Sequence, residues 1–318
     1  MMSVMLRFLA VLLLMLGFNV GLAGERMEKI VTTEDGLSLW TESFGQQGHR
    51  PILLIMGAMN QGVMWPESFC QHLADRGYFV VRYDHRDTGL SSTVDYQATP
   101  YRLSELKKDA LTIMRAHGMQ KAAVVGLSMG GYIAQLLAID HPEQVDRLVL
   151  ISSTADQRPY MAATMGQSLT GFDLPGPGPA LLDYVRAVAD QPARSAAEIE
   201  KSLLEGWAVT YGGSRAFPLD WVARSLRLAA RRAPDQRPAF NHAFAVAMSP
   251  DRREGIKRIQ APTLVIHGQH DVCLPLEHGE FLAGNIPKAR LEVLDMGHSF
   301  MGSWDDEIIA SLVAFLGE

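Results

Sequence analysis

Cysteines, basic clusters and metal-binding motifs are scarce or missing in this sequence. The 318 residues contain only two cysteines, Cys70 and Cys273, too few to define a disulfide framework, so we expect two free and mostly buried thiols. Basic residues form no run, and 29 Lys and Arg against 35 Asp and Glu give a net charge of −6, which argues against a nucleic-acid partner. The zinc patterns His-Glu-x-x-His and Cys-x-x-Cys are missing, as is a glycine-rich phosphate loop after a strand. We therefore expect neither a metal nor another cofactor.

The apolar stretch at the N-terminus is short. Residues 8–24 are uncharged and follow Arg7, but they fall short of the roughly 20 apolar residues that a spanning helix needs. The small residues of Gly21-Leu22-Ala23 complete the pattern of a secretory signal peptide. We expect residues 1–23 to be removed on export to a periplasm or the extracellular medium, which would leave no stable membrane anchor. An uncleaved N-terminal anchor is the alternative.

Short apolar runs alternate with helix-like stretches in the chain that follows. Runs of this kind are typical of strands that are covered on both faces of a sheet. The expected strands are residues 52–56, 79–83, 122–125, 148–151, 263–266 and 291–294. Leu103, Leu106 and Met114 are spaced as on one face of a helix, whereas residues 29–33 and 37–43 are patterned as an antiparallel hairpin. The alternation predicts an α/β fold with a mostly parallel sheet and helices on both faces.

The alternation stops in the middle of the chain. From residue 153 to about residue 260 the pattern is helical, broken by prolines and glycines, and contains no convincing strand. A block of this length is too large for a plain loop. We expect residues 24–152 and 261–318 to form one α/β core, and residues 153–260 to form a helical lid inserted into it.

The motif Gly126-Leu127-Ser128-Met129-Gly130 lies between an expected strand and a helix-like stretch. A sharp strand–turn–helix connection forces its serine into a strained conformation and presents the hydroxyl above the sheet. The flanking glycines are needed because a Cβ at either position would collide with the neighbouring strand or helix. Ser128 is the candidate nucleophile, and the alternative is a glycine-rich turn with an incidental serine.

A serine hydroxyl needs a base to remove its proton, and on this kind of sheet the chain order is serine, acid, histidine. Asp271 and His298 each follow an expected strand, so both belong at the carboxyl edge of the sheet, where ligands bind. We expect His298 to take the proton from Ser128 and Asp271 to fix the tautomer of His298. An oxyanion also needs N–H donors, and we expect these from Met129 and from Ala58.

Other acids and histidines compete for these roles. Asp156 and Asp295 are rival acids, and His270 is a lesser rival base. His267, at the end of a strand, is expected to be buried and hydrogen-bonded. Five further histidines are expected on loop or helix surfaces, namely His85, His117, His141, His242 and His278.

Several motifs together resemble a known family: Met56-Gly57, residues 82–91, the Ser128 motif, residues 268–271 and Gly297-His298. They are similar to those of the lidded α/β-hydrolase superfamily, in particular its aclacinomycin methylesterase-like serine esterases. The resemblance covers nearly all of the chain after residue 23. It implies Ser128 as nucleophile, Asp271 as acid, His298 as base, and Ala58 and Met129 as oxyanion donors. It further implies that residues 82–91 form a structural turn beside the site.

Methionines and aromatics near these positions are typical of a flexible apolar pocket. The candidate pocket residues are Met59, Trp207, Tyr211 and Trp221, although aromatics at helical spacing also serve to attach a lid to its core. We expect a small to medium hydrophobic carboxylic ester as substrate, cleaved through an acyl-enzyme. The alternatives are a C–C bond hydrolase or prolyl aminopeptidase on the same scaffold, and a non-catalytic binding protein.

Overall fold

The computed structural model describes residues 26–193 and 195–318, so the expected signal peptide lies outside the described residues. One sheet contains the strands β1 (Met27–Thr32), β2 (Ser38–Phe44), β3 (Arg50–Ile55), β4 (Tyr78–Tyr83), β5 (Ala122–Leu127), β6 (Val145–Ile151), β7 (Thr263–Gly268) and β8 (Ala289–Leu294). Their spatial order is β1-β2-β4-β3-β5-β6-β7-β8. Strand β2 pairs antiparallel with β1 and β4, and every pairing from β4 to β8 is parallel. The predicted α/β fold with an antiparallel start is confirmed.

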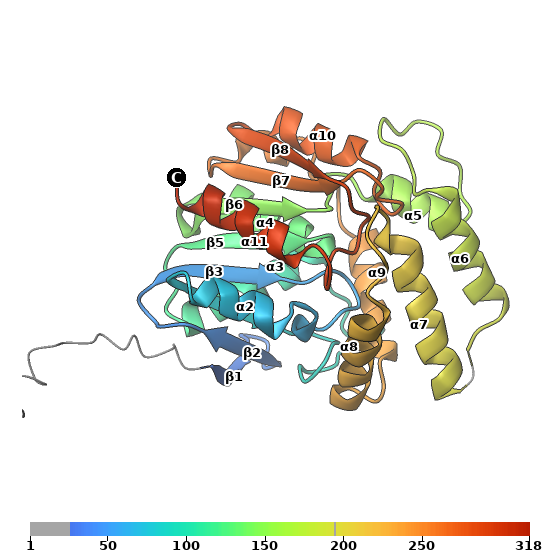
Figure 1. Cartoon of the computed structure of the whole chain (residues 1–318), viewed down its shortest axis with the longest axis horizontal. Helices are drawn as coiled ribbons and strands as arrows, with labels where there is room; N and C mark the ends of the chain where they lie inside the picture. Colours follow the sequence, from blue (N-terminus) through green and yellow to red (C-terminus); the bar gives the residue numbers. More distant parts are fainter. Residues whose placement is uncertain (1–25, 194) are drawn as a thin grey trace, which may run out of the picture.

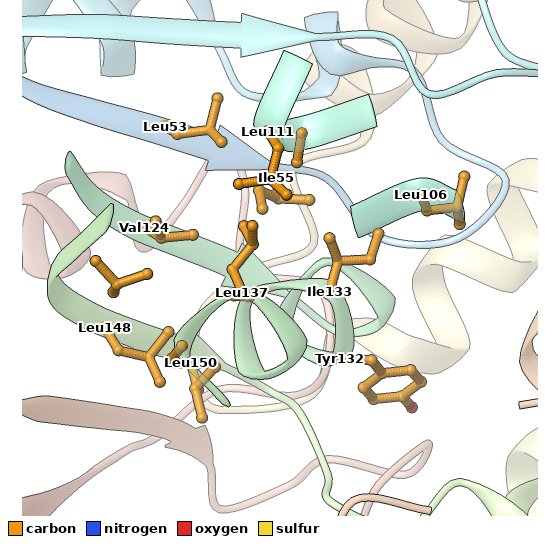
Figure 2. Close-up of a cluster of buried hydrophobic side chains, with 14 of the residues drawn as sticks. Leu53, Ile55, Leu106, Leu111, Val124, Tyr132, Ile133, Leu137, Leu148 and Leu150 are labelled. Carbon is orange, nitrogen blue, oxygen red and sulfur yellow. The ribbon is translucent and has the colours of Figure 1, made fainter. Parts of the chain in front are cut away.

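Successive residues of the central strands point to opposite faces of the sheet, as the pleat requires. Leu53, Ile55 and Val124 pack on one face, and Ile52 and Val125 pack on the other. The first face is covered by α3 (Leu103–Ala116), α4 (Met129–Asp140) and α10 (Glu277–Asn285), and Figure 2 shows its centre. The second face is covered by α2 (Glu67–Ala74) and α11 (Asp305–Leu316). Burial on both sides explains why these strands consist mostly of apolar residues.

A block of helices lies between β6 and β7 in the chain. It consists of α5 (Arg158–Thr164), α6 (Pro179–Asp190), α7 (Ala196–Tyr211), α8 (Leu219–Arg232) and α9 (Asn241–Ala247), and we call it the helical insertion. Figure 1 shows the insertion beside the sheet, at the ends to which the parallel strand arrows point. Short 3-10 turns complete the chain at Gly62–Met64 (η1), Pro142–Gln144 (η2), Arg237–Phe240 (η3) and Gly255–Arg258 (η4). Among the described residues, no helix combines the length and apolar character needed to cross a membrane.

A buried ion pair fastens α8 to the core. The Arg232 Nη2 atom lies 2.6 Å from Asp84 Oδ2, and the Arg232 Nε–H donates to Gln61 Oε1 at 3.0 Å. The guanidinium also stacks over the Trp40 ring, 4.1 Å from its centroid. Asp84 accepts further hydrogen bonds from backbone N–H groups of the core, so this pair is fully bonded, as a buried charge must be to be tolerated. The C-terminal end of α8 is therefore fixed to the start of the turn that follows β4.

Candidate active site

The serine of the glycine-rich motif occupies the connection between β5 and α4. Ser128 has φ 53° and ψ −119°, a backbone conformation that an L-residue adopts only when its surroundings hold it there. Its N–H donates to Ile151 O at 2.9 Å, and its carbonyl accepts from Gly131 N–H at 2.9 Å and from Ser153 Oγ at 3.0 Å. These bonds tie the turn to the neighbouring strand β6 and hold the strained conformation.

Two glycines make this turn possible. A Cβ at Gly126 would lie 2.3 Å from Gly130 O, and a Cβ at Gly130 would lie 2.2 Å from Ile55 O. Both distances are shorter than any real van der Waals contact, so β5, α4 and β3 could not approach so closely with larger residues. The spacing of the motif is thus explained by the packing of the strand end against the helix start.

Asp271 and His298 are brought together from the ends of β7 and β8. The His298 Nδ1 atom lies 2.8 Å from Asp271 Oδ2. The other oxygen of Asp271 accepts from the N–H groups of Cys273 at 2.8 Å and Leu274 at 2.9 Å. With both oxygens bonded, Asp271 is held rigidly, and it directs the Nε2 atom of His298 away from itself. This is the orientation that a general base needs.

The charge of Asp271 is stabilised although its side chain is fully buried. Burial alone would raise the pKa of Asp271, but the adjacent His298, through its charge and its hydrogen bond, lowers the pKa below its usual value. Asp271 and His298 follow the carboxyl ends of β7 and β8, and Ser128 follows the carboxyl end of β5, a strand of the same parallel set. The acid–histidine pair and the serine turn therefore lie at the same edge of the sheet.

The loop that carries His298 is bonded to the end of α7. Gly297 N–H donates to Tyr211 O at 2.6 Å, and His298 N–H donates to Thr210 O at 2.8 Å. The Thr210 and Ser299 hydroxyls lie 2.8 Å apart. A Cβ at Gly297 would be 2.3 Å from Tyr211 O, so only glycine permits this approach. The last carbonyls of α7, which have no partner within the helix, thus find their donors in the His298 loop.

The rival residues are engaged elsewhere. Asp156 is paired with Arg158, whose Nε and Nη2 atoms lie 2.7 and 2.6 Å from the two carboxylate oxygens. Asp295 bonds to His270 Nε2 at 2.8 Å on the surface. His267 is buried as expected; its Nε2 lies 2.7 Å from Leu274 O, and burial lowers its pKa. None of these four residues therefore offers a free acid or base beside Ser128.

The loop after β3 approaches the serine turn. A Cβ at Gly57 would lie 3.4 Å from the Cβ of Ser128, so this backbone passes directly beside Ser128. Ala58 follows at once, and Met59 adopts a positive φ of 63°. Met129 is the first residue of α4, where backbone N–H groups lack a partner within the helix. The two expected oxyanion donors are thus the chain neighbours of Gly57, which lies beside Ser128, and of Ser128 itself.

The expected surface positions of several histidines are wrong. His85, His117, His242 and His278 are all buried, because each has a hydrogen-bond partner that compensates the burial of its ring. His85 Nε2 donates to Met56 O, and His242 bonds to the Met59 N–H. Sequence patterns gave no sign of this, since a histidine in a polar turn or a short helix is usually exposed.

Burial of a neutral histidine makes stability depend on pH. Complete burial is the main cause that lowers the pKa of His85 to about 3, whereas an unfolded histidine titrates near ~6.5. As the pH falls below about 6.5, the unfolded chain takes up a proton that the folded chain refuses, so the free energy of unfolding decreases.

A His85→Gln variant keeps a donor for Met56 O but has no imidazole to protonate. We therefore predict that the difference in free energy of unfolding between the wild type and this variant becomes smaller as the pH falls. The gap should close by about 2 kcal/mol between pH 7 and pH 5. Urea unfolding at both pH values measures this, and carboxylate titrations cancel in the difference. If this difference in free energy stayed constant between the two pH values, His85 would take up a proton as readily in the folded protein as in the unfolded chain.

The candidate pocket residues lie in two places. Met59 is 41% exposed on the loop beside Ser128. Trp207 and Trp221 come from α7 and α8, and their rings contact edge to face with centroids 6.2 Å apart. Both rings pack against the buried residues on the face of the sheet that α2 and α11 cover. Tyr211 is buried at the end of α7 and contacts Phe217, with ring centroids 5.5 Å apart. The two tryptophans thus join the insertion to the segment after His298.

Cys273 lies beside the acid–histidine pair. One ligand atom from each of Asp271, Cys273 and His298 falls within 4.8 Å of the others, which is a spacing that metal sites share. Burial, however, raises the pKa of the Cys273 thiol well above its usual value, and only a thiolate binds metal strongly. Both carboxylate oxygens of Asp271 are already bonded. This group of atoms therefore fits a hydrogen-bonded aspartate–histidine pair better than a metal site. Cys70, like Cys273, is free and buried, as expected.

Comparison with known proteins identifies relatives along most of the chain. The family described as the alpha/beta hydrolase fold matches residues 50–302. Rhodomycin D methylesterase DauP of Streptomyces sp. strain C5 is 35% identical over 288 residues, which cover 89% of this chain and 96% of the relative. A putative carbamate hydrolase, RutD of Caulobacter sp. strain K31, is 26% identical and is covered to 97%. The crystal structure of a hydrolase from Pseudomonas aeruginosa PA01 superimposes with a TM-score of 0.69 at 27% identity, covering 92% of this chain and 98% of that one.

Proposed function

Because the chain belongs to the α/β-hydrolase family and has esterase relatives, we propose that it is an exported serine esterase. Its substrates are small to medium hydrophobic carboxylic esters, which it cleaves through an acyl-enzyme intermediate. The family resemblance that the sequence motifs indicated is confirmed by these relatives.

One observation carries the serine mechanism. The His298 Nδ1 atom lies 2.8 Å from a buried, rigidly held carboxylate oxygen of Asp271, at the same sheet edge as the strained Ser128 turn. An aspartate in this position fixes the neutral histidine with its proton on Nδ1 and its lone pair on Nε2. A histidine prepared in this way, at the sheet edge that also carries Ser128, is suited to accepting the proton of a serine hydroxyl.

The reaction then follows from the roles of these groups. His298 Nε2 takes the proton of Ser128 as the Oγ atom bonds to the ester carbonyl carbon. The carbonyl oxygen becomes negative, and the N–H groups of Ala58 and Met129 stabilise it. The tetrahedral intermediate collapses, the C–O bond to the alcohol breaks, and His298 returns the proton to the leaving alcohol. Water repeats the sequence on the acyl-enzyme and releases the carboxylic acid.

The substrate class is supported by the chemistry around Ser128. Met59 is exposed on the loop beside Ser128, whereas the side chains of Met56 and Met129 are buried in the core. The Trp207–Trp221 pair of the insertion packs against the segment that follows His298. Methionine and tryptophan side chains contact apolar groups over large areas without a fixed shape requirement. We propose that Met59, Trp207, Tyr211 and Trp221 contact the hydrophobic parts of the ester. The insertion then acts as a lid over the substrate.

A chain-length panel of p-nitrophenyl esters, combined with fluorophosphonate labelling, tests this function. We expect turnover of acyl chains of intermediate length and one adduct, located at Ser128 by mass spectrometry of the peptide. Turnover of vinylogous diketones or of proline amides in preference to esters would instead assign a C–C hydrolase or a prolyl aminopeptidase. Absence of any adduct would assign a non-catalytic binding protein.

Export rests on the leader alone. Residues 1–23 have the charge, apolar stretch and small residues of a signal peptide, and we propose cleavage after Ala23. The mass of the protein recovered from the periplasm or medium decides this, because the mature chain would begin at Gly24. Recovery of the full-length chain from a membrane fraction would contradict it.

A further inference from the structure

The loop beside Ser128 has a backbone conformation that it cannot hold alone. Met59 has φ 63°, a left-handed value that is unfavourable for a residue with a long side chain and persists only when neighbours fix it. The Asn60 side chain donates to Ala58 O at 3.0 Å, which is a bond within the loop itself. The loop therefore needs further partners from outside its own sequence.

Two buried imidazoles supply these partners, one at each end of the loop. His85 Nε2 lies 2.9 Å from Met56 O, and His242 Nδ1 lies 3.0 Å from Met59 N. The two rings contact edge to face, with centroids 5.5 Å apart and an interplanar angle of 85°. His85 comes from the turn after β4, whereas His242 comes from α9 of the insertion. The loop is thus clamped between the core and the insertion.

The tautomer of His242 is determined by its two partners. A backbone N–H only donates, so Nδ1 must accept from Met59. A carbonyl only accepts, so Nε2 must carry the proton that bonds to Arg86 O at 2.9 Å. Besides these groups, the charged or titratable side chains that act on the ring are those of His85 and Arg86. His242 is fully buried and therefore keeps one neutral form and one orientation.

We propose that His242 is a positioning residue of the oxyanion hole, contributed by the helical insertion. It occupies the Met59 N–H and holds the left-handed turn, and it thereby aims the Ala58 N–H at the oxyanion that forms beside Ser128. In the part of the chain that the structure describes, no acceptor is bonded to the Ala58 N–H. This inference rests on the proposed serine mechanism, which defines where the oxyanion forms.

Two conservative substitutions separate positioning from mere packing. In His242→Asn the amide oxygen takes the place of Nδ1 and still accepts from Met59, whereas the bond to Arg86 O is lost. In His242→Gln the amide nitrogen takes the place of Nε2 and still donates to Arg86 O, whereas Met59 N–H loses its acceptor. We expect kcat on p-nitrophenyl butyrate to fall roughly 10- to 100-fold in His242→Gln and within about threefold in His242→Asn.

A transition-state analogue provides the second readout. An aryl trifluoromethyl ketone forms a hemiketal oxyanion on the serine, so its affinity should fall with kcat in His242→Gln while KM stays unchanged. His117→Gln is the matched control, because His117 is also buried and bonds to Thr41 at 2.9 Å on the far side of the core. It should lower thermal stability without changing kcat or the affinity for the analogue.

Amide hydrogen exchange of residues 57–60 tests the loop without any turnover. We expect slow exchange at Met59 in the wild type and in His242→Asn, and fast exchange in His242→Gln. Equal losses of kcat in both variants, or fast exchange at Met59 in the wild type, would overturn the inference. A wild type without esterase activity but with this exchange pattern would instead refute the proposed function and leave the positioning intact.

Discussion

Replacing Ser128 by alanine should lower kcat on a p-nitrophenyl ester by about 10⁴-fold or more, as removal of a serine nucleophile does elsewhere. The variant loses the atom that bonds to the acyl carbon, so no acyl-enzyme forms. The fold should not suffer, because the backbone bonds of Ser128 to Ile151, Gly131 and Ser153 do not involve its hydroxyl. Alanine tolerates the same backbone angles as serine. Steady-state kinetics and thermal unfolding on the same preparation measure both effects.

Ser153→Ala is the matched control for this substitution. Ser153 Oγ donates to the carbonyl of Ser128 at 3.0 Å, so this variant also removes a hydroxyl at the same turn but leaves the nucleophile in place. It should keep its fluorophosphonate adduct and most of its activity. If Ser128→Ala turned over esters at a rate near that of the wild type, another residue would have to be the nucleophile.

Asp271→Asn should lower kcat by roughly 10³- to 10⁴-fold. An asparagine amide facing Nδ1 donates a proton rather than accepting one, so it favours the tautomer of His298 with its proton on Nε2. That tautomer cannot accept the proton of Ser128. The imidazolium that forms during the reaction would also lose the negative charge of the Asp271 carboxylate. In the wild type, His298 lowers the pKa of Asp271 and so favours this charge. The measurement is kcat on the preferred ester.

Asp156→Asn distinguishes the rival acid. Asp156 is buried and engaged by Arg158, so its loss should weaken the fold but leave the activity of the folded fraction nearly unchanged. Comparison of kcat per labelled active site corrects for any unfolded protein. The assignment of the acid would be reversed if Asp156→Asn lost activity as strongly as we expect for Asp271→Asn.

The fold could be predicted from the sequence because strands that are buried on both faces of a sheet consist of short runs of apolar residues. The strands β3 to β7 are apolar at nearly every position, since each lies between two layers of helices. Ser128 was predictable for a related reason. Gly126 and Gly130 are required by close backbone approach, so a packing constraint is written directly into the spacing of the motif.

The supports of the site could not be predicted in the same way. Arg232, His242 and Thr210 act through contacts to residues that are distant in the chain. A polar residue that bonds across the fold looks, in sequence, like any exposed polar residue. Local patterns indicate whether a position is buried in a regular layer, but they do not indicate which residue from a distant part of the chain it will contact.

The seam between α7 and the His298 loop has a consequence for how substrates enter. Thr210 and Tyr211 accept backbone hydrogen bonds from His298 and Gly297. The end of α7 therefore cannot move away from the core without also moving the imidazole of His298. The entrance must then open elsewhere around the rim. A chimaera that carries a different helical insertion on this core must therefore keep the C-terminal end of α7. Without these hydrogen bonds, the loop that carries His298 would change position.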